Sequence, residues 1–368
     1  MKFEKMQKES NKKLFFTRQL LKWNTLDNHR AMPWKGEKDS YKIWLSEIIL
    51  QQTRVEQGLA YYNRFITQFP TVQQLAKAPE TKVFKLWEGL GYYTRCKNLI
   101  ASAKYISLEL KGKFPETFDG ILNLKGVGPY TAAAISSFAF NLPHAVVDGN
   151  VFRVLARFFG IEISIDCNEG KKIFTSLAND LLDKKNPGIY NQALMDFGAV
   201  ICKPQQPLCK TCVLKSSCTA YLQGLINVLP VKEKTIIKKF RWFYYIIVEY
   251  NGEVYVRKRP AKDIWENLYE FVLYENCIEL PLKEIEKLSF IKNSFGKMRF
   301  KLISISKIYK QLLSHQTVYG QFIHIKILKP FKIDRYEMVN DKKLHKLPFP
   351  KLINAYLVDN DLFADKAE

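Results

Sequence analysis

The stretch Cys202-Lys-Pro-Gln-Gln-Pro-Leu-Cys209-Lys-Thr-Cys212-Val-Leu-Lys-Ser-Ser-Cys218 holds four of the chain's seven cysteines within seventeen residues. Its spacing, C-x6-C-x2-C-x5-C, lets four thiolates meet on one inorganic centre. Cysteine ligands alone suit either Zn²⁺ or an iron–sulfur cluster, and the spacing does not separate the two. The run therefore predicts a metal centre with these four cysteines as ligands.

Two disulfides are the alternative use of four cysteines. The start of the chain, MKFEKMQKESNKK, is charged and has no apolar signal segment, and the other three cysteines are scattered. Both observations favour reduced thiols and a cytoplasmic protein.

The chain is long and strongly basic. Its 368 residues allow two or three domains, and its 47% hydrophobic content is that of a folded protein. Lysine and arginine number 57 against 36 acidic residues, a net charge of +21. This excess favours a polyanionic partner, with nucleic acid ahead of a membrane surface, although a lysine-rich source composition also explains it. No apolar run approaches the roughly 18 residues of a membrane span.

Periodicity divides the chain into two parts with a linker between them. Residues 1–225 are predicted to be mainly helical, because apolar residues recur at spacings of three and four, and this part ends with the cysteine loop at 202–218. Residues 226–240 are predicted as a linker. Residues 241–368 are predicted as a small α+β domain, with a strand, an Asn251-Gly252 turn and a second strand at its start. Short helices are expected at 282–288 and 351–357.

Three segments of the helical part carry candidate chemistry. Gly126-Val-Gly128-Pro is a hairpin that opens a helix, which suits backbone binding of one phosphate, or is an ordinary tight turn. Asp148 precedes the helix of residues 149–159, where it can cap the helix. Glu47 lies in a helix that is apolar around most of its circumference, so its carboxyl is either poorly solvated with a raised pKa or on a solvated edge.

These features together resemble a known family. The Gly-x-Gly hairpin, the aspartate about twenty residues later and the cysteine spacing resemble the helix-hairpin-helix DNA glycosylases that carry a [4Fe–4S] cluster. The segments at 44–53 (WLSEIILQQT), 87–93 (WEGLGYY) and 147–150 (VDGN) are similar to the adenine-specific mismatch glycosylases, the MutY family, over roughly residues 11–358. The resemblance favours a [4Fe–4S] cluster over zinc.

The resemblance implies a role for each matching residue. Glu47 corresponds to the general acid that protonates the departing adenine at N7, and Asp148 to the carboxylate that stabilises the oxocarbenium-like sugar. Two carboxyls acting on one glycosidic bond agree with general glycosidase chemistry. Tyr130 and Asn150 correspond to residues that hydrogen-bond around the sugar and the acid. Related enzymes that cut the strand through a Schiff base have a lysine in place of Tyr130, so strong lyase activity is not expected.

Other matching residues are implied in DNA recognition, for which the base must be rotated out of the duplex. The resemblance places Gln52, Thr53, Leu90 and Tyr92 at the 8-oxoguanine opposite the adenine. It places Arg30, Trp34 and Gln192 in the wall of the adenine pocket, with Lys35 where an arginine can occur. The alternative for the aromatic residues is core packing.

The C-terminal part resembles the Nudix-like domain of the same glycosylases. It lacks the glutamate-rich helix that a Nudix hydrolase needs, so the resemblance implies a reader of the damaged base without hydrolase activity. Ser314 and His315 correspond to the 8-oxoguanine-probing loop, in which Leu313 stands where phenylalanine is common. The alternative is a strand end with only structural hydrogen bonds.

The predicted function is removal of adenine paired with 8-oxoguanine or guanine in double-stranded DNA by a monomer, as a step of base excision repair. One alternative is an endonuclease III-like pyrimidine glycosylase and lyase, against which Tyr130 and the extra domain argue. The other alternative is a non-catalytic iron–sulfur DNA-binding protein, which has no need of Glu47 and Asp148.

Overall fold

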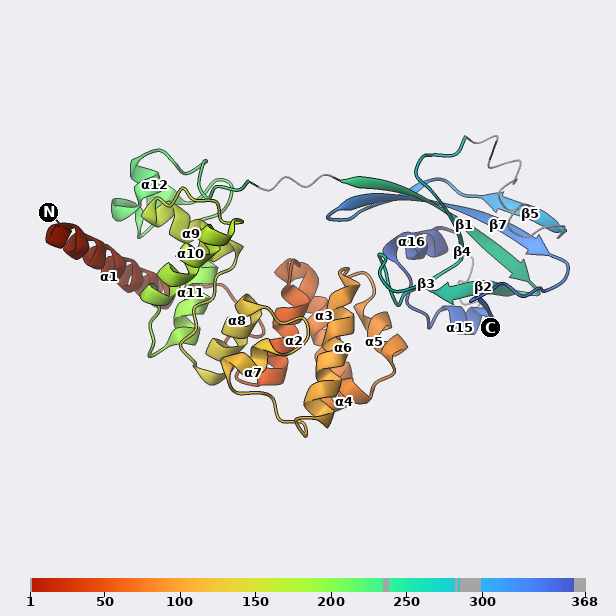
Figure 1. Ribbon diagram of the computed structural model, residues 1–368, viewed down its shortest axis with the longest axis horizontal. Coiled ribbons are helices and arrows are strands. Elements are labelled where there is room, and N and C mark those ends of the chain that lie inside the picture. The colour runs from red at the N-terminus through yellow and green to blue at the C-terminus, as the bar shows by residue number, and fades with distance from the viewer. Residues whose placement is uncertain (1, 234–237, 282–283, 285–298, 361–368) are drawn as a thin grey trace. The chain divides into compact units, whose positions relative to one another are not determined.

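The computed structural model describes residues 2–233, 238–281, 284 and 299–360. The chain forms two compact units (Figure 1). The first unit consists of residues 1–76 and 101–235, and the second of residues 77–100 and 236–368. The helical segment 77–100, which precedes half of the first unit in sequence, thus groups with the C-terminal part. Each unit has its own core.

The first unit is helical, in agreement with the periodicity of its sequence. Helices α4 (Val72–Lys77) and α6 (Tyr93–Leu108) cross the boundaries between the units. The helices that lie within the first unit are α1 (Lys2–Leu26), α2 (Ser40–Leu50), α3 (Val55–Gln68), α7 (Phe118–Leu122), α8 (Pro129–Phe140), α9 (Gly149–Phe159), α10 (Asn168–Leu181), α11 (Pro187–Val200) and α12 (Thr219–Leu222). Two short 3₁₀ turns, Cys209–Thr211 and Lys215–Ser217, lie between α11 and α12.

Local sequence explains where the site-bearing helices begin and end. Asp39 caps α2 by accepting hydrogen bonds from the backbone of Tyr41 and Lys42. Helix α8 begins at Pro129 after Gly128, as the sequence predicts, because proline suits the first turn of a helix. Helix α9 begins after Asp148 and ends at Gly160, whose φ of 71° suits glycine.

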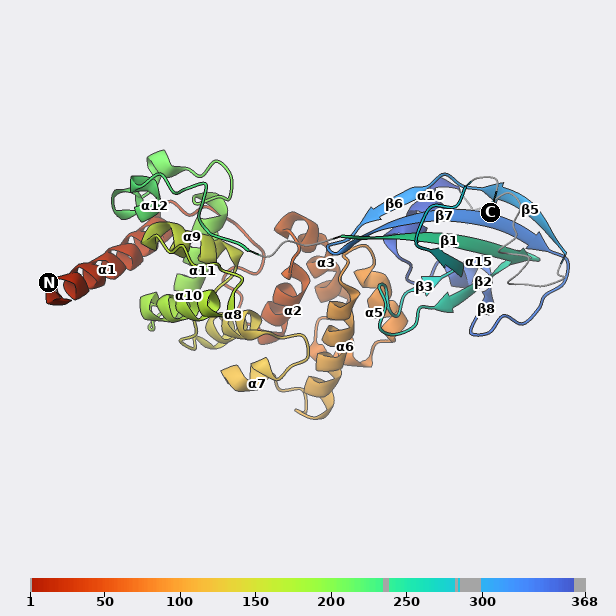
Figure 2. The same ribbon diagram turned by 45° about the horizontal axis from the view of Figure 1, so that its top comes forward.

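Two apolar clusters hold these helices together. The larger one joins α1, α9, α10 and α11, with Phe16, Trp23 and Phe197 among its buried residues. The smaller one joins α8 to the segment before α9, through Ala133, Ala134 and Val146. Helix α2 lies beside α8 (Figures 1 and 2). The helices that carry Glu47, Tyr130 and Asp148 are therefore packed in one body.

The second unit contains a mixed sheet. Its strands are β1 (Lys239–Tyr250), β2 (Glu253–Lys258), β3 (Tyr269–Glu270), β4 (Val272–Asn276), β5 (Phe300–Ile305), β6 (Tyr309–Leu312), β7 (Gln316–Ile327) and β8 (Glu337–Val339). The order along the sheet is β3-β2-β1-β7-β5; in addition β4 pairs with β1, β6 with β7 and β8 with β2. Strands β1 and β7 run parallel, and the other pairs are antiparallel.

The predicted turn between the first two strands is confirmed. Asn251 and Gly252 have φ values of 48° and 76°, as a two-residue hairpin loop between β1 and β2 requires. The predicted C-terminal helix is also confirmed, as α16 (Lys351–Asp359). It packs on the sheet (Figure 1), because Tyr356 stacks on Phe322 of β7 with ring centroids 4.0 Å apart. The helix predicted at 282–288 lies outside the described residues, apart from residue 284.

The remaining elements of the second unit are α5 (Glu80–Trp87) and α15 (Asp341–Leu344). Glu88, which follows α5, accepts a hydrogen bond of 2.7 Å from the backbone of Phe349. Inside the unit, the buried carboxylate of Glu270 binds Arg257 and Arg259. The bond of Glu88 ties the segment after α5 to the segment before α16.

The segment predicted as a linker is packed at its start. Leu229 is buried in the larger helical core, and Ile165 donates its backbone N–H to Val231 at 3.1 Å. Residues 234–237 are outside the described part. Among the described residues, no helix is long and apolar enough to cross a membrane.

Candidate active site

Glu47 is the buried acid of the first unit. It lies near the end of α2, whose residues from Tyr41 to Ile49 are otherwise apolar apart from Lys42 and Ser46, and it is 7% exposed. Burial raises its pKa to about 7, a hydrogen bond with Tyr130 opposes that rise, and the charge of Asp148 adds to it. Of the two possibilities that the sequence left open, Glu47 is therefore poorly solvated and does not lie on the solvated edge of the helix. Its carboxyl holds a proton near neutral pH.

Asp148 is held at the start of α9. Its Oδ1 accepts the backbone N–H of Val151 at 2.8 Å, and its Oδ2 accepts a hydrogen bond from Asn150 Nδ2 at 2.7 Å. Burial raises its pKa, whereas these hydrogen bonds and Arg153 favour the charged form. The residue is thus both the helix cap and a neighbour of Glu47, so the two sequence interpretations are compatible.

Tyr130 is hydrogen-bonded to Glu47 and lies near Asp148. Burial, the charges of Glu47 and Asp148, and the hydrogen bond to Glu47 all raise its pKa well above the usual value, so the phenol stays protonated. Three helices, α2, α8 and α9, therefore bring Glu47, Tyr130 and Asp148 together, with Asn150 bonded to Asp148. Two nearby carboxyls in different environments, one able to hold a proton, suit acid-assisted cleavage of a glycosidic bond.

The glycine hairpin is tied to the end of α2. Gly126 has φ of 82°, which favours glycine, and its carbonyl accepts a hydrogen bond from Gln51 Nε2 at 3.3 Å. The same amide donates to Thr131 Oγ1 at 3.0 Å. Helix α2 ends at Leu50, and Gln52 beyond it has φ of 56° with an exposed side chain. The predicted recognition residues Gln52 and Thr53 thus lie in a turn.

The predicted pocket residues Arg30 and Gln192 both bind Asp196, a carboxylate buried on α11. Arg30 donates to Asp196 Oδ1 at 2.8 Å and Gln192 Nε2 donates to the same oxygen at 3.0 Å. Lys35 lies 3.1 Å from the other oxygen. Trp34 is mostly buried and packs edge-on against Tyr62, with ring centroids 5.4 Å apart.

Arg153 connects the segment of Asp148 to the cysteine loop. Its guanidinium donates to Asn150 Oδ1 at 2.8 Å, to the carbonyl of Gly198 at 2.7 Å and to the carbonyl of Cys202 at 2.7 Å. A second arginine, Arg157, lies 3.6 Å from Cys202 Sγ. The first cysteine of the loop is therefore anchored by two arginines of α9.

The four cysteines of the loop are neighbours in space. Each is a free, half-buried thiol, and Cys202 interacts electrostatically with Cys209, Cys212 and Cys218. In the part of the chain that the structure describes, no three His, Cys, Asp or Glu side chains form a site for a single metal ion.

Gly198 sets the fit between α11 and the start of α9. A Cβ at this position would lie 2.6 Å from Asn150 Cβ and 3.0 Å from its carbonyl oxygen. We expect Gly198→Ala to displace Asn150 and to lower the free energy of unfolding by about 1–3 kcal/mol, as overpacking does. Urea unfolding measures the change. Gly149→Ala is the control, because a Cβ there meets nothing within 4 Å; equal losses in both variants would contradict the steric explanation.

The second unit brings together another set of predicted residues. The hydroxyls of Tyr92 and Ser314 lie 2.6 Å apart, beside an open pocket of about 800 Å³ that is also lined by His315. Tyr92 is exposed, has φ of 50° and stacks on Arg95, whereas Leu90 is 5% exposed. Of these two predicted recognition residues, Leu90 is therefore mostly buried and Tyr92 is accessible.

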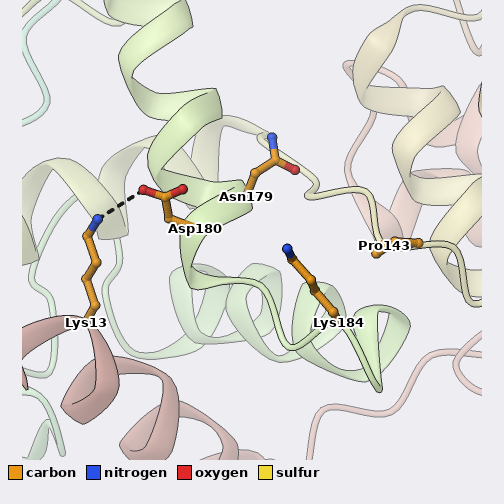
Figure 3. A pocket seen from close by; sticks show the side chains of 5 residues that line it. All are labelled: Lys13, Pro143, Asn179, Asp180 and Lys184. Carbon is orange, nitrogen blue, oxygen red and sulfur yellow. Dashed lines mark hydrogen bonds and ion pairs between the residues drawn. The ribbon is translucent and has the colours of Figure 1, made fainter. Parts of the chain in front are cut away.

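A further surface pocket of about 520 Å³ lies on the first unit (Figure 3). It is lined by Lys13, Pro143, Asn179, Asp180 and Lys184, and it contains no residue that the sequence singles out. Lys13 and Asp180 form an ion pair of 3.0 Å across it.

Sequence reasoning missed the residues that hold the site residues in place. Asp196, Arg153 and Gln51 contact predicted site residues but were not themselves predicted as site residues. A charged residue within a helix of apolar residues was the signal available for Asp196 and Arg153. Nothing in the sequence indicates the bonds of Gln51.

Comparisons with known proteins agree with this geometry. Residues 45–178 match the family described as HhH-GPD superfamily base excision DNA repair protein, and residues 243–358 match the NUDIX domain. A solved structure of a thermostable thymine-DNA glycosylase is 30% identical with a TM-score of 0.54, and the alignment covers 58% of this chain and 99% of that one. The first unit therefore has the fold of a base excision DNA glycosylase, which confirms the predicted fold class.

Two relatives identify the particular family. An adenine DNA glycosylase of Buchnera aphidicola subsp. Baizongia pistaciae (strain Bp) is 36% identical, covering 86% of this chain and 87% of that protein. An adenine DNA glycosylase of Buchnera aphidicola subsp. Schizaphis graminum (strain Sg) is 31% identical, covering 93% and 97%. The chain belongs to the adenine DNA glycosylase family, so it is a DNA N-glycosylase of base excision repair with DNA as its substrate.

Proposed function

We propose that the chain, as a monomer, hydrolyses the bond between adenine and its sugar when the adenine is paired with 8-oxoguanine or guanine, and that Glu47 and Asp148 carry the chemistry. The observation that carries this proposal is a buried carboxyl with a pKa of about 7, hydrogen-bonded to Tyr130 and close to a second carboxylate. A group with this pKa is protonated in a large fraction of molecules at neutral pH and can both donate and recover a proton.

The two carboxyls act at different stages. Glu47 gives its proton to N7 of the extruded adenine, which makes the base a better leaving group as the glycosidic bond breaks. The positive charge that develops on the sugar is stabilised by Asp148, whose two oxygens are already fixed by Val151 and Asn150. The ionised Glu47 then accepts a proton from the water that adds to the sugar, which restores the protonated form of Glu47.

The residues around the carboxyls determine the product of the reaction and bind the DNA. Tyr130 has no amine with which to attack the sugar, so cleavage ends at an abasic site. Arg30, Trp34 and Gln192 form the wall of the adenine pocket, and the hairpin of Gly126 and Gly128 offers backbone N–H groups to a phosphate. Gln52 and Thr53, in the turn after α2, face the opposite strand.

The second unit supplies recognition of 8-oxoguanine through Ser314, His315 and Tyr92. We expect Tyr92→Phe and Ser314→Ala to reduce the preference for adenine opposite 8-oxoguanine over adenine opposite guanine. Because each removes one hydroxyl of the same 2.6 Å pair, their effects should overlap in the double variant. Single-turnover rates on both duplexes measure this, with Thr317→Ser, a buried position, as the folding control. An unchanged ratio in both variants would remove these residues from recognition.

The cysteine loop is the proposed site of a [4Fe–4S] cluster. Four free, neighbouring thiols beside the cationic Arg157 fit such an anionic group, and Cys202, Cys209, Cys212 and Cys218 would hold it. When bound, the cluster supplies a rigid cross-link of the loop rather than a step of the reaction, so that Lys203, Lys210 and Lys215 can meet phosphates. Iron and sulfide analysis with the visible absorption spectrum tests this; zinc without iron would contradict it.

A base-release assay tests the function as a whole. Duplexes with adenine opposite 8-oxoguanine, guanine or cytosine, and a duplex with thymine glycol, are compared in parallel. We expect adenine release from the first two and intact abasic strands. Thymine-glycol release with strand cleavage would indicate the endonuclease III-like alternative, and binding without any release would indicate a non-catalytic DNA-binding protein.

A further inference from the structure

Asp196 on α11 is a fully buried carboxylate that binds two residues of the proposed adenine pocket, Arg30 and Gln192, although it belongs to no motif. Its side chain is 0% exposed. Oδ1 accepts from Arg30 and from Gln192 Nε2, at 2.8 and 3.0 Å, and Oδ2 accepts from Asn28 Nδ2 and Lys35 Nζ, at 3.0 and 3.1 Å. All four groups donate, so the carboxylate acts only as an acceptor in this arrangement.

A carboxylate that acts only as an acceptor fixes the amide of Gln192. Gln192 must turn its NH₂ group toward Asp196, because its carbonyl oxygen would meet the carboxylate as a second acceptor. The carbonyl oxygen Oε1 is therefore held on the other side of the amide. No hydrogen bond to that oxygen occurs among the residues that the structure describes, and the side chain is only half-buried. Gln192 thus presents a fixed acceptor.

We infer that Asp196 is a positioning residue that selects a 6-amino purine by fixing Gln192 with its acceptor toward the base. This inference rests on the proposed function, because it assumes that Gln192 lines the adenine pocket. The exocyclic amino group of adenine donates to an acceptor, whereas the 6-oxo group of guanine or hypoxanthine places a second acceptor against it. A buried mismatch of two acceptors leaves both unpaired, which is costly.

The helix that carries Asp196 also positions the segment of Asp148. Asn191, which precedes Gln192 on α11, accepts the backbone N–H of Val146 at 3.1 Å and donates to the carbonyl of His144 at 2.8 Å. Further along the helix, Gly198 packs against Asn150. Helix α11 therefore holds Gln192 in a constant relation to the residues that act on the sugar.

The test uses full-length protein and single-turnover release of adenine and of hypoxanthine, each placed opposite 8-oxoguanine. In Asp196→Asn the carboxylate is replaced by an amide, which no longer forces the orientation of Gln192. We expect the ratio of adenine to hypoxanthine release to fall about tenfold or more, the equivalent of one hydrogen bond. Asp180→Asn, an exposed carboxylate on α10 that pairs with Lys13, is the matched control and should keep the ratio.

The double variant Asp196→Asn/Gln192→Glu separates selection from a structural role. It keeps the total charge, and the amide introduced at position 196 can donate to the carboxylate introduced at position 192, which again presents an oxygen to the base. We expect the double variant to recover the preference for adenine over hypoxanthine. This expectation holds even if the single variant Asp196→Asn folds poorly. An unchanged ratio in the single variant, or no recovery in the folded double variant, overturns the inference. Failure of the unmodified protein to release adenine would instead overturn the proposed function.

Discussion

Glu47→Gln is expected to decrease the rate of adenine release by a factor of about 10² to 10⁴, while duplex binding is retained. Glutamine has the same shape and can still bond to Tyr130, but it has no proton to give to the base. Gel-shift binding and single-turnover base release, measured on the same preparation, check this result. Glu169→Gln, at an exposed position in the first turn of α10, is the control. Substantial release by Glu47→Gln would exclude Glu47 as the acid.

The raised pKa of Glu47 also determines the pH dependence. The acid form is the active one, and its pKa is about 7, so the rate should decrease about tenfold for each pH unit above that value. On the acid side, the rate should decrease as Asp148 becomes protonated, because the sugar then loses its anion. The two groups are close, so the bell-shaped profile reports the pair. A rate that increases through pH 8 would contradict this assignment.

The same pKa predicts a change in stability. In the unfolded chain Glu47 titrates near 4.5, and in the folded protein near 7, so the folded state binds the proton more tightly. Stability relative to Glu47→Gln should therefore decrease as pH rises from about 4.5 to 7, by about 3 kcal/mol in total. Above pH 7 the inactive glutamine variant should be the more stable protein. Urea unfolding of both proteins at pH 5 and pH 8 measures this.

Asp148→Asn is expected to decrease adenine release about a thousandfold, because it removes the anion that faces the developing positive charge. Asparagine is as good a helix cap as aspartate, so α9 should persist. If its oxygen replaces Oδ1 toward Val151, however, its NH₂ group faces Asn150 Nδ2, which is also a donor. We therefore expect a stability loss of only about 1 kcal/mol.

A second aspartate cap provides the matched control. Asp39 caps α2 in the same manner as Asp148 caps α9, but it is exposed. Asp39→Asn should change neither release nor, beyond a few tenths of a kcal/mol, stability. Equal losses of activity in both variants would show that capping, rather than charge, is what Asp148 contributes.

Much of the fold and of the catalytic pair could be predicted from the sequence because short-range rules govern them. Pro129 after Gly128, Asp148 before α9 and Asn251-Gly252 between two strands each specify a local backbone conformation that the structure confirms. Glu47 could be predicted as a buried acid because residues near it on α2 are apolar around most of the helix. Its pKa of about 7 depends further on Tyr130 and Asp148, which other helices supply.

The sequence by itself therefore determined the helices, the hairpins, the cysteine spacing and the residue types of the site. Only the tertiary structure decided which side chains meet. Asp196 accepts from Asn28, Arg30 and Lys35, more than 160 residues earlier in the chain, and Arg153 reaches Cys202, 49 residues later. Hydrogen bonds of this kind depend on distance in space and leave no periodic signal along the chain. Burial of a charge is likewise a property of all the elements packed around it, which no single stretch of sequence records.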